Sequence, residues 1–310
     1  MFSKILVPLD GSDLAERALD PAIRLALAEN GEIILLSIPY LKHMIMREKA
    51  GYGFLMPDDS LDRTHREMSD YLATLQRIKS NPNITMRSQV IEGDEAGTIV
   101  DTAIREEADL IVMSTHGRSG FSRWMMGSVT ERVLRSAPCP VLVIRQAEKL
   151  FRLLIPLDGS PLAETALNPG LELAKALGAR VTLLQVQEQT LNVTAATFAQ
   201  MDAVMEYASG YPSEEEVVAR ASAYLDNLSN VYAPEEVRVN TAVVVNSAAR
   251  GILEYAEAND ISLIVMATHG YTGLRRWVYG SVTEKVLRGA HCAVMIIRPP
   301  AQQLKGEASA

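Results

Sequence analysis

The sequence STHGRSGFSRWMMGSVTER runs from Ser114 to Arg132. A second run, ATHGYTGLRRWVYGSVTEK, extends from Ala267 to Lys285 and repeats it 153 positions later. Each run begins at the end of a short apolar segment, LIVM, and leads into a segment whose apolar residues have helical spacing. The sequence therefore contains the same unit of strand, loop and helix twice.

The repeat extends outward from these two runs. The segment ILVPLDGS (residues 5–12) matches LLIPLDGS (153–160), and PVLVIR (140–145) matches AVMIIR (293–298). Three separated blocks thus occur in the same order in both halves of the chain. Self-similarity of this kind indicates that two similar domains are joined in tandem.

The length of the chain fits this division. A chain of 310 residues is long for one compact domain and suits two domains of about 150 residues each. We expect domain one at residues 1–147, domain two at 151–300 and a flexible tail at 301–310. With 48% hydrophobic and 5% aromatic residues, each domain can build a core of aliphatic side chains.

Short apolar runs in the first copy predict five strands, at Lys4–Pro8, Ile33–Ile38, Ile84–Ile91, Leu110–Met113 and Val141–Ile144. Segments with helical spacing lie between most of them, so the expected order is βαβαβαβαβ in each copy. Continuous apolar strands that alternate with helices are typical of a parallel sheet covered on both faces. In such sheets, ligands bind at the carboxyl ends of the strands.

The end of each repeated run predicts a helix N-terminus. In the second copy, Ser160 and Pro161 likewise predict the start of a helix, and Gly178 predicts the end of the next one. The pattern Ser-x-x-Glu predicts a capping box in both repeated runs, formed by Ser128 with Glu131 and by Ser281 with Glu284. Free backbone N–H groups at a helix N-terminus bind phosphate, although a cap with a purely structural role is the alternative.

Composition excludes several other classes. The net charge of −8 disfavours a general nucleic-acid binder, which needs clustered Lys and Arg. No P-loop, metal-ligand spacing, signal peptide or membrane-length apolar run is present. We expect a cytoplasmic protein whose two cysteines, Cys139 and Cys292, are reduced and buried.

Taken together, these blocks resemble the universal stress protein family, and they do so in both halves. The resemblance is carried by ILVPLDGS, by the pattern Gly-x9-Gly-Ser after IVM-x-THG, and by PVLVIR. It implies two Rossmann-like domains with strand order 3-2-1-4-5, each with a nucleotide lying across strands one and four. It also implies an intramolecular pseudo-dimer paired through strand five, with further homo-oligomerisation open.

The same resemblance assigns ATP, with or without Mg²⁺, as the ligand. The base and ribose would contact strand one and strand two, and the phosphates would meet the glycine-rich run. In domain one the implied binding residues are Pro8, Leu9, Asp10, Ile38, Met113, Ser114, His116, Gly117, Arg118, Gly127, Ser128, Val129 and Thr130. In domain two they are Pro156, Leu157, Asp158, Val186, Met266, Ala267, Gly270, Gly280, Ser281, Val282 and Thr283.

Two differences separate the copies. The family motif is usually written Gly-x-x-Gly-x9-Gly-Ser/Thr, and its first glycine is replaced by Ser114 and by Ala267. Domain two also has Tyr271 where domain one has Arg118, which removes a positive charge. If only one domain binds ATP, we expect it to be domain one.

Three functions stay open at this stage. The first is a nucleotide-binding regulator in the stress response. The second is a slow ATP hydrolase, which is disfavoured because no lysine lies in the glycine-rich run of domain one and no acid–base pair is evident there. The third is an interaction module without a nucleotide, in which the motif serves the fold alone.

Overall fold

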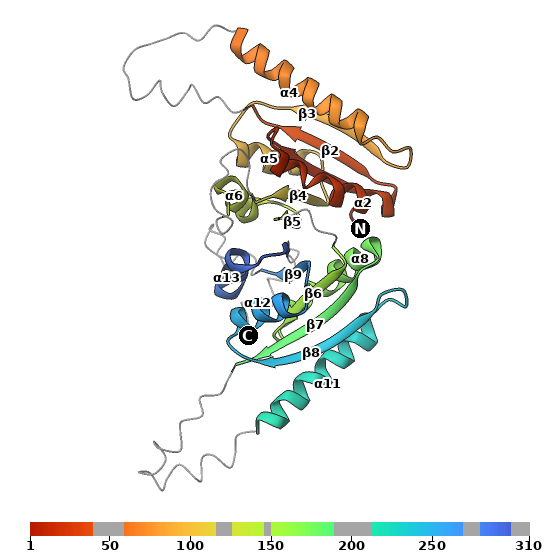
Figure 1. Ribbon diagram of the computed structural model, residues 1–310, viewed down its shortest axis with the longest axis vertical. Helices are drawn as coiled ribbons and strands as arrows, with labels where there is room; N and C mark the ends of the chain where they lie inside the picture. Colours follow the sequence, from red (N-terminus) through yellow and green to blue (C-terminus); the bar gives the residue numbers. More distant parts are fainter. Residues whose placement is uncertain (40–58, 116–125, 146–149, 189–212, 269–279, 299–310) are drawn as a thin grey trace, which may run out of the picture.

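The protein is described here by a computed structural model that covers residues 1–39, 59–115, 126–145, 150–188, 213–268 and 280–298. The predicted tail at 301–310 lies outside these residues. Figure 1 shows an elongated molecule in which helices flank a central sheet along its whole length.

Strands and helices alternate along domain one as the sequence predicts, and every predicted strand is present within two residues of its expected ends. The strands are β1 (Lys4–Leu9), β2 (Glu32–Ser37), β3 (Thr85–Val90), β4 (Leu110–Ser114) and β5 (Val141–Ile144). The helices are α1 (Asp13–Glu16), α2 (Leu19–Glu29), α4 (Asp59–Ile78), α5 (Glu95–Arg105) and α6 (Ser128–Ser136).

Domain two repeats this arrangement element for element. Its strands are β6 (Arg152–Leu157), β7 (Arg180–Gln187), β8 (Val239–Val245), β9 (Leu263–Ala267) and β10 (Ala293–Ile297). Its helices are α7 (Pro161–Glu164), α8 (Leu167–Leu177), α11 (Glu214–Tyr232), α12 (Ala248–Ala258) and α13 (Ser281–Gly289).

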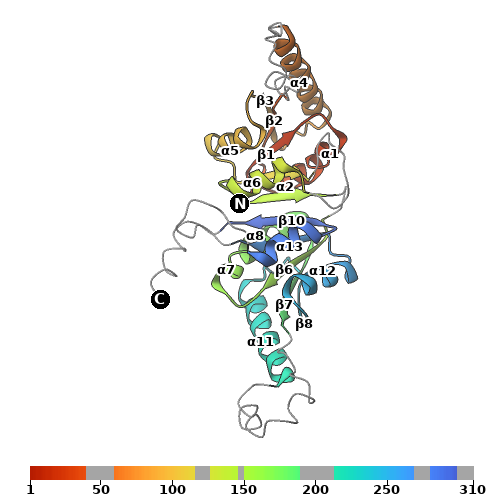
Figure 2. The same cartoon turned by 90° about the vertical axis from the view of Figure 1, so that its left-hand side faces the viewer.

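Each domain has the strand order 3-2-1-4-5, which confirms the predicted topology. The observed order is β3-β2-β1-β4-β5 in domain one and β8-β7-β6-β9-β10 in domain two, with parallel pairing inside each domain. At the junction, β5 and β10 pair antiparallel, with Leu142 opposite Met295 and Val143 opposite Val294. The two halves therefore form one ten-stranded sheet (Figures 1 and 2).

The two faces of this sheet are covered by different helices. On one face, α1, α2, α4, α8 and α11 contribute buried side chains to a core cluster that includes Leu25, Leu72 and Leu225. On the other face, α5, α6, α12 and α13 contribute to a second cluster that includes Ile99 and Ile252. Both clusters contain residues of both domains, so the apolar core is continuous across the junction.

Local sequence signals explain where several helices begin and end. Ser160 is the N-cap of α7, accepting a 3.1 Å bond from the N–H of Ala163, and Pro161 occupies the first helical position. Both features agree with the sequence analysis. Gly178 ends α8 in the left-handed conformation, with φ of 64°, which glycine adopts without steric cost. The start of α7 and the end of α8 are therefore both fixed by residues that the sequence marks.

An ion-pair network fastens the edge strand β3 to its neighbours. The guanidinium of Arg87 bonds the carboxylate of Glu106 at 2.5 Å and also the carboxylate of Glu32. Gln89 donates a further 3.1 Å bond to Glu106. The bond from Arg87 lowers the pKa of Glu106 to about 2.

This network predicts a loss of stability in acid. Because its pKa is depressed in the folded state, Glu106 contributes stability above its ordinary pKa of 4.5, and this contribution is lost as the pH falls towards 2. Glu106→Gln should lower the free energy of unfolding by about 1–2 kcal/mol at pH 7, after allowance for solvent screening. Urea titrations should show this difference from the wild type shrinking between pH 4.5 and pH 2.

The matched control is Glu131→Gln, which removes an exposed pair with Arg135 one helical turn away. An exposed pair of this kind contributes about 0.3–0.5 kcal/mol, so the control should change little at any pH. A deficit in Glu106→Gln that stayed constant down to pH 2 would refute an electrostatic origin.

Candidate functional site

The candidate site lies where strands β1 and β4 end side by side. The two strands are parallel neighbours, with Ile5 opposite Leu110 and Leu6 opposite Ile111. The turn after β1 and the exit of β4 therefore lie at the same edge of the sheet. Strands β6 and β9 have the same relation in domain two, with Leu153 opposite Leu263.

An aspartate organises the turn after the first strand of each domain. Oδ1 of Asp10 accepts a 3.0 Å bond from the N–H of Ser12 and a 2.6 Å bond from its hydroxyl. Asp158 makes the same two bonds to Ser160, at 2.9 and 2.6 Å. Each aspartate thus has the turn-holding role that short polar side chains commonly have. An ionised carboxylate offers about four acceptor positions, so this role is compatible with contact to a ligand.

A tyrosine–glutamate pair braces each of these turns. The hydroxyl of Tyr71 in α4 donates a 3.0 Å bond to Glu16 in α1, and Tyr224 in α11 donates a 2.8 Å bond to Glu164 in α7. Burial, followed by the charge of Glu16, raises the pKa of Tyr71, so the phenol stays protonated as a donor. Sequence analysis did not select these residues, although their matching positions in the two copies are a usable signal.

Backbone contacts fix the start of α6 at the exit of β4. The N–H of Gly127 donates a 2.9 Å bond to the carbonyl of Thr115, and the hydroxyl of Thr130 donates a 3.1 Å bond to the carbonyl of Ser114. A Cβ on Gly127 would lie 2.7 Å from the oxygen of Thr115, which is closer than real Cβ contacts allow. Glycine is therefore required here because of this close approach.

The predicted capping boxes are wrong. The N-caps are Gly127 and Gly280, and α6 and α13 begin one residue earlier than the capping box requires, at Ser128 and Ser281. The physical reason in domain one is the tight contact of Gly127 with β4, which places glycine at the cap position. Glu131 and Glu284 instead pair with cations one turn further along, Arg135 and Arg288.

Because glycine has no side chain, the cap residue cannot occupy the donors of the first turn. The first N–H groups of an α-helix have no acceptor within the helix. At α6 these groups belong to Ser128, Val129 and Thr130, and at α13 to Ser281, Val282 and Thr283. Both helices thus present donors suited to an anion at the carboxyl edge of the sheet.

The other predicted residues that the structure describes differ in the face of the sheet on which they pack. Ile38 and Val186 are half-buried and pack against the core cluster that contains Met113 and Met266. In contrast, Leu9 and Leu157 are each 3% exposed and belong to the cluster on the opposite face, so only their backbone faces the turn. Several predicted residues lie outside the described ranges: His116, Gly117, Arg118 and Gly270, together with the compared residue Tyr271.

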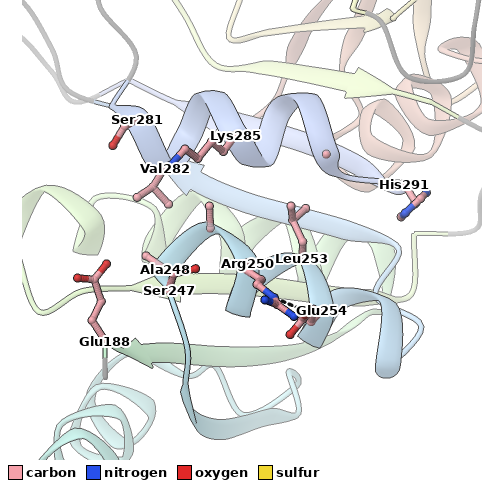
Figure 3. A pocket seen from close by; sticks show the side chains of 12 residues that line it. Glu188, Ser247, Ala248, Arg250, Leu253, Glu254, Ser281, Val282, Lys285 and His291 are labelled. Atoms are coloured by element: carbon pink, nitrogen blue, oxygen red, sulfur yellow. Dashed lines mark hydrogen bonds and ion pairs between the residues drawn. The ribbon is translucent and has the colours of Figure 1, made fainter. Parts of the chain in front are cut away.

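Domain two has an open groove of about 580 Å³ beside this edge, between α12 and α13 (Figure 3). Ser281 and Val282, two of the predicted residues, line it together with Lys285. Arg250 and Glu254 lie on the opposite wall and form an ion pair of 2.6 Å. The groove therefore brings the first turn of α13 together with a surface that sequence analysis did not identify.

In domain one, the equivalent helices are joined by an ion pair. Arg132 on α6 forms two bonds to the carboxylate of Asp94, the N-cap of α5, and one of them is 2.8 Å long. The equivalent positions in domain two hold Lys285 and Ser247, so the described part of the second copy lacks this ion pair. A comparison of the two repeats could have found this difference, because the charged pair of the first copy is not repeated in the second.

Three further properties of the described residues concern metal sites, membrane-spanning helices and cysteines. No group of three or more His, Cys, Asp or Glu side chains within them could hold a metal ion. None of the helices in these ranges is long and apolar enough to cross a membrane. Cys139 and Cys292 are both buried, as predicted, and neither is in a disulfide. Burial raises the pKa of the Cys139 thiol to about 12.

Comparison with known proteins shows which family the sequence matches. The sequence matches the Universal stress protein family twice, over residues 1–145 and 150–298. The chain belongs to the universal stress protein family. The two matched segments correspond to the two halves of the ten-stranded sheet.

The relatives include universal stress proteins that match about half of this chain and others that match nearly all of it. One from Methanocaldococcus jannaschii is 30% identical over 149 residues, which cover 48% of this chain and 85% of that protein. One from Synechocystis is 23% identical over 319 residues, covering 96% of this chain and 100% of that protein. The crystal structure of a universal stress protein from Archaeoglobus fulgidus has a TM-score of 0.64 at 20% identity, covering 96% and 99% of the two chains, which supports the fold.

The departures from the usual family motif lie in β4 and β9. Ser114 is the last residue of β4 and is 9% exposed, and its carbonyl accepts the bond from Thr130. Ala267 is the last residue of β9. Both residues continue a regular strand, so this universal stress protein does not need glycine there to maintain the sheet.

Proposed function

We propose that this universal stress protein binds ATP and uses its occupancy as a regulatory signal in the stress response. The observation that carries the proposal is the position of α6, whose glycine-capped first turn is bonded to the end of β4 next to the turn of Asp10. Helix α13 and Asp158 repeat this arrangement at β9 and β6. Backbone donors and a carboxylate at one sheet edge suit a phosphate and a ribose, respectively.

Each part of the nucleotide would meet a different element. The carboxylates of Asp10 and Asp158 would accept bonds from ribose hydroxyls, while Ile38 and Val186 would contact the base. The first turns of α6 and α13 would donate to the phosphates. Mg²⁺ would enter with ATP, because it commonly binds through substrate phosphates and few carboxylates.

Binding is favoured over hydrolysis. Phosphoryl transfer requires cations to neutralise developing charge and a residue to position water. The glycine-rich run of domain one, residues 114–132, contains no lysine, and no acid–base pair is evident in it. We therefore propose a binding protein that responds to the nucleotide and does not hydrolyse it. Because β5 and β10 pair within one chain, the two domains form an intramolecular pseudo-dimer.

The test begins with protein purified without added nucleotide. Denaturation followed by mass spectrometry should release ATP, and adding Mg-ATP to stripped protein should raise its melting temperature. Asp10→Asn should weaken binding to domain one, since asparagine can still accept the bond from Ser12 but lacks the charge. Asp13→Asn is the matched control, because Asp13 is exposed in α1.

The alternatives give different results in the same experiment. ADP that accumulates from added ATP would indicate the slow hydrolase. Absence of a released nucleotide, together with no thermal shift from Mg-ATP, would contradict the proposal and favour the interaction module.

A further inference from the structure

Two arginines cross the junction between the domains in a reciprocal manner. Arg298, which follows β10, donates a 2.7 Å bond to the carbonyl of Leu134 and a second bond to the carbonyl of Ala137. Arg145, which follows β5, donates to the carbonyl of Leu287. Each guanidinium therefore contacts the C-terminal turn of a helix in the opposite domain, α6 or α13.

These contacts supply what a helix C-terminus lacks. The last four carbonyls of an α-helix have no donor within the helix, and a cation there is favoured by the helix dipole. The arginines provide both the donors and the charge. The final turns of α6 and α13 are thus completed only when the two domains are paired.

The same two helices carry the proposed phosphate-binding turns at their other ends. Each has nine residues, which corresponds to a length of about 13 Å. An isolated helix of this length is not stable in water, so each helix depends on the packing of its buried residues and on the contacts at its two ends. Loosening of its last turn will therefore reach its first turn.

We propose that the opposite domain's arginine couples nucleotide binding in each domain to the pairing of the domains. Arg298 thereby acts as a positioning residue for the site in domain one, and Arg145 does so for the site in domain two. The part of this inference that concerns ATP rests on the proposed function. By linkage, the coupling is reciprocal, so ATP bound at one end of α6 strengthens the junction at the other.

The chain contains a matched control for this inference. Arg24 in α2 also crosses the junction, donating a 2.9 Å bond to the carbonyl of Leu177 at the end of α8 and lying 5.2 Å from the ring centroid of Phe151. Helix α8 begins at Leu167 and does not carry a glycine-capped turn at the sheet edge. Loss of Arg24 therefore weakens the junction without touching a site helix.

The experiment compares Arg298→Met, Arg145→Met and Arg24→Met in the full chain by hydrogen exchange. The reporters are two amides at the helix starts: Glu131, which bonds the carbonyl of Gly127 at 3.0 Å, and Glu284, which bonds that of Gly280 at 3.0 Å. Without ATP, Arg298→Met should accelerate exchange at Glu131 about fivefold and leave Glu284 unchanged. Arg145→Met should do the reverse, and Arg24→Met should affect neither.

With Mg-ATP, the affinity measured from protection at Glu131 should fall about fivefold in Arg298→Met, with little change in Arg24→Met. Equal effects of all three variants, or no effect of Arg298→Met on Glu131, would overturn the coupling. If the wild type shows no ATP-dependent protection, the proposed function fails, while the exchange rates without ATP still decide whether the junction controls the helix start.

Discussion

Gly127→Ala is expected to weaken ATP binding to domain one about tenfold, which corresponds to about 1.4 kcal/mol. The added Cβ would lie 2.7 Å from the carbonyl oxygen of Thr115, and this oxygen belongs to the backbone. The start of α6 must therefore move away from β4. That movement displaces the donors of Ser128 and Val129 from the proposed phosphate position.

The same substitution should also lower the free energy of unfolding, by about 1–3 kcal/mol, because the crowded contact cannot relax through a side chain. Urea unfolding measures the stability, and ATP-dependent protection of the Glu131 amide measures binding to domain one. Gly178→Ala is the control. Its φ of 64° makes alanine strained, yet nothing lies within 4 Å of the new Cβ, so stability should fall by about 1 kcal/mol while binding stays unchanged.

Equal loss of ATP binding in both variants would mean that general destabilisation is responsible. Wild-type affinity in Gly127→Ala would show that the first turn of α6 does not hold the phosphates. Either result would show that ATP binding does not depend on the close contact between α6 and β4.

Sequence analysis predicted the strands well because buried parallel strands appear as continuous apolar runs. Val141–Ile144 has the predicted ends, and β4 extends only one residue beyond the predicted run Leu110–Met113. The helix starts were harder to predict. The sequence Gly-Ser-x-x-Glu allows either Ser128 or the preceding glycine to be the cap, and only a cap at Ser128 would form the capping box. The contact of Gly127 with the residue after β4, distant in sequence, decides for glycine.

The interdomain contacts depend on information that neither copy contains by itself. The sequence shows an arginine after strand five in both halves, at Arg145 and Arg298, but their acceptors are determined by the antiparallel pairing of β5 with β10. The groove in domain two arises in a similar way. Its lining includes Ser247 and Lys285, which stand where domain one has the Asp94–Arg132 pair, and this correspondence becomes informative only when the fold places those positions together.

Met295→Ala is expected to destabilise both domains together, by about 2–5 kcal/mol. Met295 in β10 is fully buried, lies opposite Leu142 of β5, and belongs to a core cluster that includes residues of both domains. Removing its side chain leaves a cavity at the junction. Because the core is continuous there, we expect calorimetry to show one unfolding transition, shifted to lower temperature.

Leu225→Ala is the matched control, since Leu225 is equally buried but lies in α11, near the far edge of domain two. If unfolding is cooperative across the whole sheet, both variants will lower the same transition. Native-state hydrogen exchange adds a local measurement in domain one. Met295→Ala should accelerate the exchange of amides in β5 through local opening, whereas Leu225→Ala should leave the local opening of β5 unchanged. Two separate unfolding transitions, with the unfolding temperature of domain one unchanged in Met295→Ala, would contradict a cooperative junction. If both domains share one core, a cavity at its centre must lower the stability of each.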